Sequence, residues 1–206
     1  MNNLLKRYPC LSEIKEEIIK AKEIIISCYE KEGKLLLCGN GGSSADCDHI
    51  VGELMKGFLK ERCLSDEKKA QMKKNAPFLE DEILSKLQCG LPAISLPSMT
   101  ALNTAFSNDI EPELVYAQSL MALGNENDVL VAISTSGNSK NVSAAAKVAK
   151  ALGCKVIALT GASGGKLKEL SDVCLCVPEE ETFKVQELHL PIYHYLCAQT
   201  EAHFFK

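Results

Sequence analysis

The sequence predicts an α/β protein with a central five-stranded parallel sheet between two layers of helices. Five short apolar runs have the length of buried strands, and stretches with apolar residues at helical spacing separate most of them. No tight hairpin joins two of the runs, so each connection is expected to cross over in a right-handed sense and leave the strands parallel. A parallel sheet is covered on both faces, which makes a three-layer sandwich. The predicted strands are residues 34–38, 92–96, 129–133, 155–159 and 172–177.

Length and composition indicate one domain, residues 1–206. The chain is 46% hydrophobic and 24% charged, which suits a single globular domain with a full core. Its net charge of -4 argues against nucleic acid as a ligand. No run approaches the roughly 20 apolar residues that cross a bilayer, and the first residues lack the features of a signal peptide. We therefore expect a cytoplasmic protein that binds neither nucleic acid nor membranes.

Helical spacing predicts an N-terminal helix over 11–30, whose apolar stripe packs on the core or on a partner subunit. Further helices are predicted over 45–55, 142–152 and 185–202. Residues 59–88 differ in character, because lysine and glutamate dominate the first half and Pro77 interrupts the segment. We interpret 59–88 as an insertion that forms one or two surface helices, since it is too short for a core of its own.

Ten cysteines admit three interpretations. A disulfide scaffold does not suit a chain of this size without secretion features. A zinc cluster would need paired short spacings, and the only close pair is Cys174 and Cys176, which would share one face of a strand. Most of the cysteines are therefore expected to be small buried apolar residues.

The apolar run 129–133 leads into a loop rich in hydroxyl groups, Ser134-Thr135-Ser136-Gly137-Asn138-Ser139, which we call the serine loop. Backbone N–H groups and hydroxyls before a helix favour an anion. The loop lacks the lysine of a P-loop, so a single phosphate on a small metabolite fits better than a nucleoside triphosphate. The alternative is an ordinary turn in which serine caps the helix.

A second loop of this kind, Gly39-Asn40-Gly41-Gly42-Ser43-Ser44, follows the run 34–38, and we call it the asparagine loop. A third glycine- and serine-rich turn follows the run 155–159. Ligands of parallel sheets bind at the carboxyl ends of the strands, where these loops lie. The sequence therefore places the site at the asparagine and serine loops.

Polar residues that could perform chemistry lie on two predicted helices. His49 and Glu53 are four residues apart and share a helix face, so they are either a surface ion pair or groups that bind a metal or move protons. Gln186 and His194 lie within about 80° of one another around the last helix. Pro191 lies between them, and the sequence leaves open whether it turns His194 toward the site.

Taken together, these motifs resemble the SIS (sugar isomerase) domain over nearly the whole chain except 59–88. The residues that carry the resemblance are the two loops, Leu159-Thr160-Gly161, Ser107-Asn108-Asp109 and Gln186-Glu187-x-His189. The resemblance implies a flavodoxin-like, Rossmann-like fold and aldose–ketose isomerisation of a phosphorylated sugar. Within the family, the chain is most similar to the branch that converts sedoheptulose 7-phosphate to D-glycero-D-manno-heptose 7-phosphate. The resemblance also implies a homotetramer with active sites between subunits.

The resemblance also implies roles for individual residues. Glu53 corresponds to the general base and His194 to its partner acid. One Zn²⁺ per subunit is implied, and no redox cofactor. Its ligands match His49, Glu53, Gln186 and His194. The residues that match the substrate-binding positions are Asn40, Gly41, Gly42, Asn108, Asp109 and Gln186, with Ser134, Thr135, Ser136 and Ser139 on the phosphate.

Two departures from the family pattern bear on the substrate. Phe183 stands where an acidic residue usually precedes the C-terminal glutamine by three, and the insertion 59–88 replaces a much shorter loop. Two alternatives therefore stay open: a non-catalytic adaptor that binds the replication initiator, and a sensor or isomerase of another phosphosugar. The presence of both Glu53 and His194 favours the enzyme.

Overall fold

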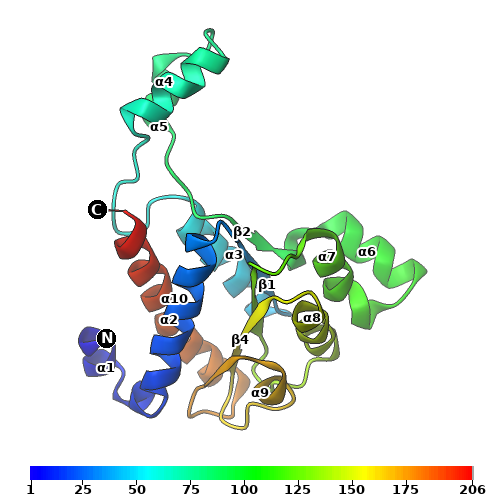
Figure 1. Cartoon of the computed structure of the whole chain (residues 1–206). Coiled ribbons are helices and arrows are strands. Elements are labelled where there is room, and N and C mark those ends of the chain that lie inside the picture. The colour runs from blue at the N-terminus through cyan, green and yellow to red at the C-terminus, as the bar shows by residue number, and fades with distance from the viewer. Residues whose placement is uncertain (206) are drawn as a thin grey trace.

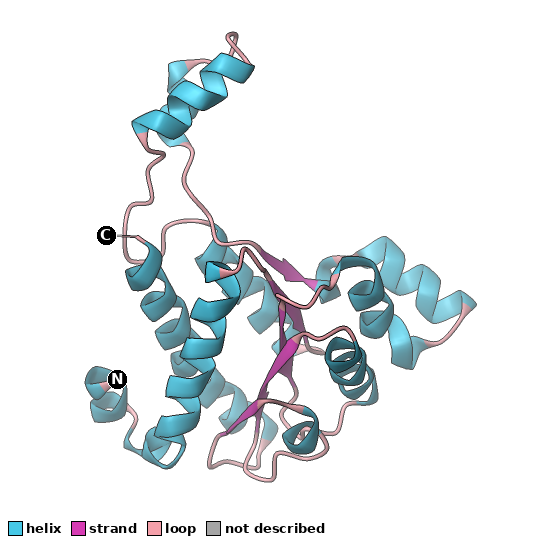
Figure 2. Ribbon diagram, in the orientation of Figure 1, coloured by secondary structure: helices cyan, strands magenta, loops and turns pink. Residues whose placement is uncertain are grey.

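A computed structural model describes residues 1–205 and shows a five-stranded parallel sheet in the order β2-β1-β3-β4-β5 (Figure 2). The α/β fold class and all five predicted strands are confirmed, with ends that differ by at most one residue. The strands are β1 Leu35–Cys38, β2 Ala93–Ser95, β3 Val129–Ile133, β4 Lys155–Thr160 and β5 Val173–Cys176.

Helices cover both faces of the sheet, as predicted (Figure 1). One face carries α2 (Lys15–Glu30), α3 (Gly42–Met55) and α10 (Thr182–Phe204), and the other carries α7 (Val115–Leu123), α8 (Lys140–Ala151) and α9 (Leu167–Leu170). Strand side chains alternate between the two cores: Leu35 and Leu37 pack on the first set, and Leu36 and Cys38 on the second. Burial on both faces explains why the strands are continuously apolar.

The N-terminal helix differs from the prediction for 11–30. Residues Pro9–Ile14 form a 3₁₀ helix, and the α-helix begins only at Lys15; a separate short helix, α1 (Asn2–Arg7), precedes both. Proline at the first position of the 3₁₀ helix suits that position, because its missing N–H would have no partner there. The apolar spacing continues through both segments, so periodicity alone could not separate them.

The helices α6 (Thr100–Asp109) and α7 were not predicted, nor were the short helices α1 and α9 and the 3₁₀ turns Leu96–Ser98 and Pro112–Leu114. In the described chain, α6 has no fully buried residue, and its only large apolar residues are Leu102 and Phe106, so its apolar stripe is short. In contrast, α7 is buried along most of its length, so its apolar residues do not alternate with polar ones. Both patterns weaken the helical signal.

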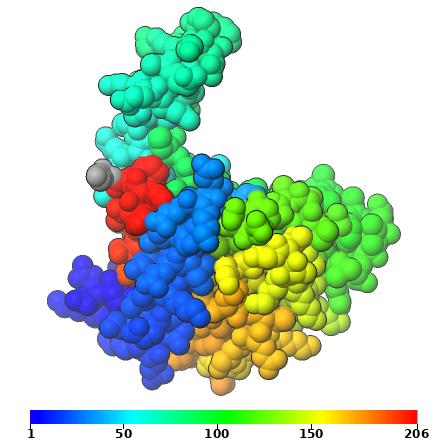
Figure 3. All heavy atoms as spheres, viewed as in Figure 1, coloured from blue at the N-terminus to red at the C-terminus, as the bar shows by residue number. Residues whose placement is uncertain are grey.

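The segment 59–88 projects from the body of the molecule and contains α4 (Asp66–Asn75) and α5 (Asp81–Lys86) (Figures 1 and 3). We call this segment the arm. An antiparallel bridge between Cys63 and Gln88 closes its base. Its two helices bury few side chains, Leu84 among them, so most of the arm is exposed.

The ten cysteines are all free: five are buried, three are half-buried, and Cys10 and Cys63 are exposed. The Sγ atoms of Cys174 and Cys176 lie 3.4 Å apart on β5, as expected for alternate residues of a strand. Among residues 1–205, none of the helices is sufficiently long and apolar for a membrane span.

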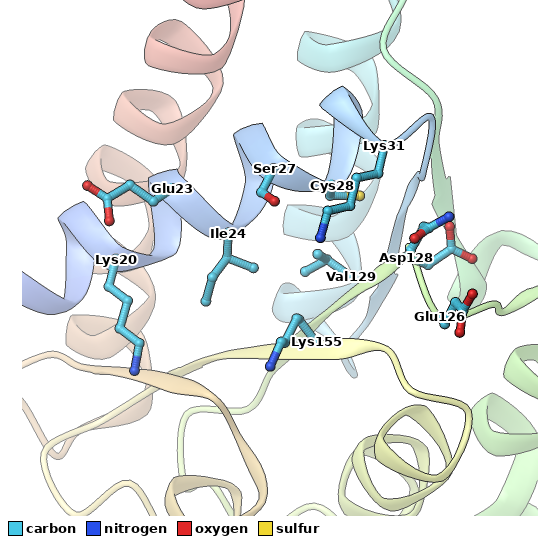
Figure 4. A pocket seen from close by; sticks show the side chains of 11 residues that line it. Lys20, Glu23, Ile24, Ser27, Cys28, Lys31, Glu126, Asp128, Val129 and Lys155 are labelled. Atoms are coloured by element: carbon cyan, nitrogen blue, oxygen red, sulfur yellow. The ribbon is translucent and has the colours of Figure 1, made fainter.

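A cavity of about 300 Å³ opens at the amino-terminal edge of β3 and β4 (Figure 4). Its walls carry lysines and acidic residues together, including Lys20, Lys155, Glu23 and Asp128. Ligands of parallel sheets bind at the opposite edge, where the strands end. We therefore locate the candidate site at the carboxyl edge and on the helices that leave it.

His189 of α10 is fully buried, and burial lowers its pKa to about 4 although the carbonyl oxygen of Thr160, 3.3 Å from Nε2, acts in the opposite direction. The unfolded chain, with an ordinary histidine pKa near 6.5, therefore binds more protons between pH 6.5 and pH 4. We expect this residue's contribution to stability to be complete above pH 6.5 and to fall by about 3 kcal/mol as the pH drops to 4.

Urea unfolding at fixed protein concentration from pH 7 to pH 4.5 measures this effect. His189→Gln should flatten the dependence of the unfolding free energy on pH, whereas His203→Gln, at an exposed position on the same helix, should not. An unchanged slope in His189→Gln would exclude His189 as the responsible group.

Candidate active site

Three predicted residues from two helices form one cluster. α3 supplies His49 and Glu53, and α10 supplies His194. His49 Nε2 lies 3.2 Å from Glu53 Oε1 and 3.4 Å from His194 Nε2. One donor atom from each of the three residues falls within 4.8 Å of the other two. The His49–Glu53 pair is thus more than a surface ion pair, because it meets a residue 145 positions away.

Tyr193 and Asp46 orient the cluster, and the sequence analysis missed both. The Tyr193 hydroxyl donates to Asp46 Oδ1 over 3.1 Å and lies 3.0 Å from His49 Nδ1. Since Tyr193 has one O–H and gives it to Asp46, its oxygen accepts from His49 Nδ1–H. This tautomer leaves the Nε2 lone pair of His49 directed at Glu53 and His194, as a metal-binding or proton-accepting histidine requires.

The Glu53 carboxylate is largely shielded from water, with 15% of its side chain exposed. Among residues 1–205, its Oε2 atom has no hydrogen-bond partner. Lys56 is the nearest cation, with Nζ 3.8 Å from Oε2. A shielded carboxylate oxygen without a partner costs free energy unless a ligand or a proton uses it.

His194 is the second imidazole of the cluster. Burial, together with the nearby His49, lowers the pKa of His194, while Glu53 opposes the shift. The neutral imidazole is therefore favoured, and its nitrogen keeps a lone pair. Two imidazole nitrogens and one carboxylate are a donor set that suits Zn²⁺.

The asparagine loop is joined to the first turn of α8, which directly follows the serine loop. The side-chain amides of Asn40 and Asn141 exchange two hydrogen bonds of 2.9 Å each. The Tyr116 hydroxyl contacts Asn40 Oδ1 at 3.1 Å and the carbonyl of Gly39 at 2.8 Å. Gly41 adopts a φ of 55°, which favours glycine at this turn. Asn141 and Tyr116 were not predicted as residues of the site. For Asn141, its position directly after the serine loop, in the first turn of α8, could have indicated it.

Hydroxyls and free backbone donors meet at the serine loop. Ser134 Oγ lies 2.9 Å from Ser139 Oγ, so Ser139 does not cap α8 with its side chain. In the part of the chain that the structure describes, the N–H groups of Ser139 and Lys140 donate to no protein acceptor. Free N–H groups at a helix N-terminus suit a phosphate. The ordinary capped turn is therefore the weaker interpretation.

The third glycine-rich turn, after β4, supports the serine loop. Gly137 adopts a φ of 65°, and a Cβ there would lie 2.1 Å from the carbonyl oxygen of Gly164. Gly161 N–H donates to the carbonyl of Thr135 over 2.8 Å. This close backbone contact holds Thr135 and its neighbours in place and explains the glycines of the turn.

Comparison with known proteins identifies the family. A family model described as the SIS domain matches residues 2–88 and 82–161. Phosphoheptose isomerase of Helicobacter pylori (strain P12) is 40% identical over 194 residues, which cover 94% of this chain and 88% of the relative. The chain belongs to the phosphoheptose isomerase family of SIS-domain proteins. The resemblance seen in the sequence is thereby confirmed.

Other members of the phosphoheptose isomerase family agree with this assignment. The Campylobacter jejuni relative is 40% identical over 184 residues, covering 89% of this chain and 85% of the relative. The solved structure of a phosphoheptose isomerase from Francisella tularensis has a TM-score of 0.78 at 33% identity, covering 95% of this chain and 91% of that one. The structure of phosphoheptose isomerase from Neisseria gonorrhoeae has a TM-score of 0.76 at 32% identity. The match covers 98% of this chain and 94% of that one.

Gln186, the fourth ligand implied by the family, lies apart from His194 along the same helix. Its side-chain amide packs against Gly42, where a Cβ would come within 2.6 Å of Nε2. Eight residues of α-helix place the two Cα atoms about 12 Å apart along the axis. The structure therefore brings three of the four predicted ligands together and puts Gln186 beside the asparagine loop, so its role as a ligand stays a prediction.

Asn108 and Asp109 end α6, where both are exposed and Asn108 Nδ2 donates to Asp109 Oδ1 over 2.9 Å. Four residues after Asp109, Glu113 forms an ion pair with Lys140, which lies next to the serine loop; Lys140 Nζ is 2.6 Å from Glu113 Oε1. The contact of Asn108 and Asp109 with the sugar stays a prediction. Phe183, which departs from the family pattern, is 57% exposed at the start of α10, where Lys184 Nζ lies over its ring.

Proposed function

We propose that this chain is an aldose–ketose isomerase that converts sedoheptulose 7-phosphate to D-glycero-D-manno-heptose 7-phosphate. The observation that carries the proposal is the His49, Glu53 and His194 cluster in a chain 40% identical to a phosphoheptose isomerase. The cluster also makes a non-catalytic adaptor the poorer interpretation, because such a protein needs no acid and base in contact.

Glu53 would act as the base. Isomerisation removes a proton alpha to the carbonyl and returns it to the neighbouring carbon through an enediol(ate). The Oε2 atom of Glu53 is free to accept that proton, and its shielding from water limits exchange with solvent. His194, as a largely neutral imidazole, would move protons between the sugar oxygens. The electrons stay within the sugar, so no redox cofactor is required.

The serine loop would bind the phosphate far from the reacting carbons. The hydroxyls of Ser134, Thr135, Ser136 and Ser139 and the free N–H groups at the start of α8 support this role. Binding energy from the phosphate would hold the other end of the sugar in register with the base. Asn40, Gly41, Gly42 and Gln186 adjoin the loop and would line the substrate next to it.

Distance supports a site shared between subunits. Eleven residues of α3 separate Gly42, beside the phosphate loops, from Glu53, which is about 16 Å along the helix axis. An extended chain advances about 1.2 Å per bond, so the eight bonds from C1 to phosphorus span only about 10 Å. By this estimate, a sugar whose phosphate lies beside Gly42 would not reach Glu53 of the same chain. We propose a homotetramer in which each site combines a loop and a Glu53 from different subunits.

We also propose one Zn²⁺ per subunit, held by His49, Glu53 and His194 of one chain. Because Gln186 lies about 12 Å from His194 along the same helix, the fourth ligand would be the partner subunit's Gln186. The two imidazole nitrogens and the Oε1 atom of Glu53, which lies 3.2 Å from His49 Nε2, fit such an ion and leave Glu53 Oε2 for the proton. When bound, the ion would supply a Lewis acid that polarises the sugar carbonyl. The free cysteines and the metabolic substrate support a cytoplasmic location.

Phe183 favours a second candidate, isomerisation of another sugar phosphate. An acidic residue is usual at this position, and an exposed aromatic ring cannot replace its contact with a hydroxyl. Turnover of a panel of ketose and aldose phosphates decides between the two substrates.

Glu53→Gln and His194→Ala should each lower kcat by about 100- to 10,000-fold, because a positioned acid or base contributes that much. Purified protein with sedoheptulose 7-phosphate, with EDTA or with added Zn²⁺, provides the measurement. His203→Ala, an exposed histidine paired with Glu30, is the matched control and should keep full activity. Absence of turnover in the unchanged protein at every metal content would refute the proposed function.

Mixed oligomers test the shared site. Neither Glu53→Gln nor the double variant Ser134→Ala with Ser139→Ala should be active alone. If the sites combine two subunits, co-refolding the two variants should restore turnover, since some sites then pair an intact loop with an intact Glu53. Sites contained within single chains would give no restoration.

Zinc titration tests the metal site. Calorimetry should find about one Zn²⁺ per chain. Both His49→Ala and Tyr193→Phe should weaken zinc binding, and the loss of affinity in His49→Ala should be at least as large as that in Tyr193→Phe. Loss of the tyrosine hydroxyl removes the partner of His49 Nδ1, which costs about 10- to 100-fold in affinity at comparable sites. An unaltered zinc affinity in His49→Ala would exclude the cluster as the zinc site. His203→Ala is again the control and should bind zinc as the unchanged protein does.

A further inference from the structure

Arg62, at the base of the arm, is a fully buried arginine whose guanidinium group contacts the backbone of Glu53. Its Nη2 donates to the Glu53 carbonyl over 3.1 Å, and its Nη1 donates to the Leu54 carbonyl over 2.5 Å. The guanidinium also lies over the ring of Phe205, 4.6 Å from the centroid. No side chain of the cluster is touched, so Arg62 acts on Glu53 only through the main chain.

The end of α3 needs a cation from elsewhere. The last carbonyls of a helix lack partners within it, and they form the negative end of its dipole. The last turn of α3 contains no basic residue. Arg62 supplies the missing charge. Its planar fork donates to two successive carbonyls while Nε donates to Glu201, a fixed geometry that a lysine ammonium cannot reproduce.

Glu201 ties the same guanidinium to α10. Its Oε1 accepts from Arg62 Nε over 2.8 Å, and both side chains are almost completely buried. The Glu201 carboxylate also accepts from the N–H groups of Phe58 and Leu59, each over 2.8 Å. Burial alone would raise the pKa of Glu201, but these N–H groups and Arg62 lower it overall, so the carboxylate stays charged. Every charge in this buried network therefore has a partner.

The network joins the two helices that carry the cluster. Glu201 lies seven residues after His194, two turns along the same face of α10. Arg62 therefore bonds α3 at Glu53 and α10 on the face of His194. Its own carbonyl accepts from Cys89 N–H over 2.7 Å, so the two chain segments at the base of the arm also meet there.

We propose that Arg62 is a positioning residue that holds the Glu53 backbone, and thereby its carboxylate, in register with His194. The proposal rests on the proposed function, in which Glu53 is the base. A displacement of about 1 Å at a reacting group costs up to about 100-fold in rate, so a residue that sets this register controls kcat without touching the sugar. Since the phosphate binds elsewhere, KM depends little on Arg62.

The test compares Arg62→Lys with a matched variant of the same segment. Lys60→Gln removes the bond from Lys60 Nζ to the Phe205 carbonyl, which also ties the arm to the end of α10 but does not reach α3. Arg62→Lys should lower kcat by about 10- to 100-fold with KM changed less than about 2-fold. Lys60→Gln should change neither by more than about 2-fold. An unchanged kcat in Arg62→Lys, or an equal loss in Lys60→Gln, would overturn the proposal.

Chemical rescue separates positioning from a general loss of stability. In Arg62→Ala, added guanidinium ion should restore kcat at least about 5-fold, because it can reoccupy the site between the two carbonyls and Glu201. Methylammonium, which lacks the planar fork, should not restore it. Equal effects of the two ions would contradict the proposed role.

Amide hydrogen exchange provides a measurement that needs no turnover and remains available if Arg62→Ala does not fold. Exchange at residues 53–56 should be faster in Arg62→Lys than in the unchanged protein and unaffected in Lys60→Gln. If the unchanged protein does not isomerise the sugar, the proposed function fails, and exchange still reports whether Arg62 holds Glu53. If the unchanged protein is active and hydrogen exchange in Arg62→Lys is unchanged, the positioning role is refuted while the proposed function stands.

Discussion

The candidate site depends on one packing interaction, the parallel arrangement of α3 and α10 on the same face of the sheet. Because both helices run in the same direction, Gly42 meets Gln186 at one level and His49 meets Tyr193 and His194 two turns further on. The loops proposed to bind phosphate therefore lie at the end of the helix pair nearest the sheet edge, and the cluster of His49, Glu53 and His194 lies further along it. In the proposed homotetramer, one chain contributes these two parts to different sites.

A second constraint is the buried charge at the far end of this helix pair. Arg62 and Glu201 are removed from water, so each requires full hydrogen bonding to be tolerated. The partners that satisfy them are the carbonyls of α3 and the N–H groups that begin the arm. The same bonds that make the charges tolerable also fix the relative position of α3, α10 and the arm. These bonds therefore connect the arm to the two helices that carry the His49, Glu53 and His194 cluster.

Much of this arrangement was predictable from the chain itself. The five strands, the helices that flank them, the two loops and the His49–Glu53 pair all depend on residues that are close in sequence. The helices α6 and α7 were missed because α6 has only two large apolar residues, Leu102 and Phe106, and α7 has few polar residues between its apolar ones, so both show weak amphipathic spacing. Arg62 was missed for another reason: an arginine within a run of charged residues predicts a solvated surface, and nothing local shows that it is buried.

By itself, the sequence determined the α/β fold, the place of the two glycine- and serine-rich loops after buried strands, and the residue types capable of acid–base chemistry. These are consequences of local periodicity, turn chemistry and short spacings. Only the tertiary structure decided which of these residues meet. It joined His194 to His49, Asn141 to Asn40, and Arg62 to Glu201. The physical reason is that contacts between residues about 100 or more positions apart depend on how whole helices pack on the sheet, which no local pattern encodes.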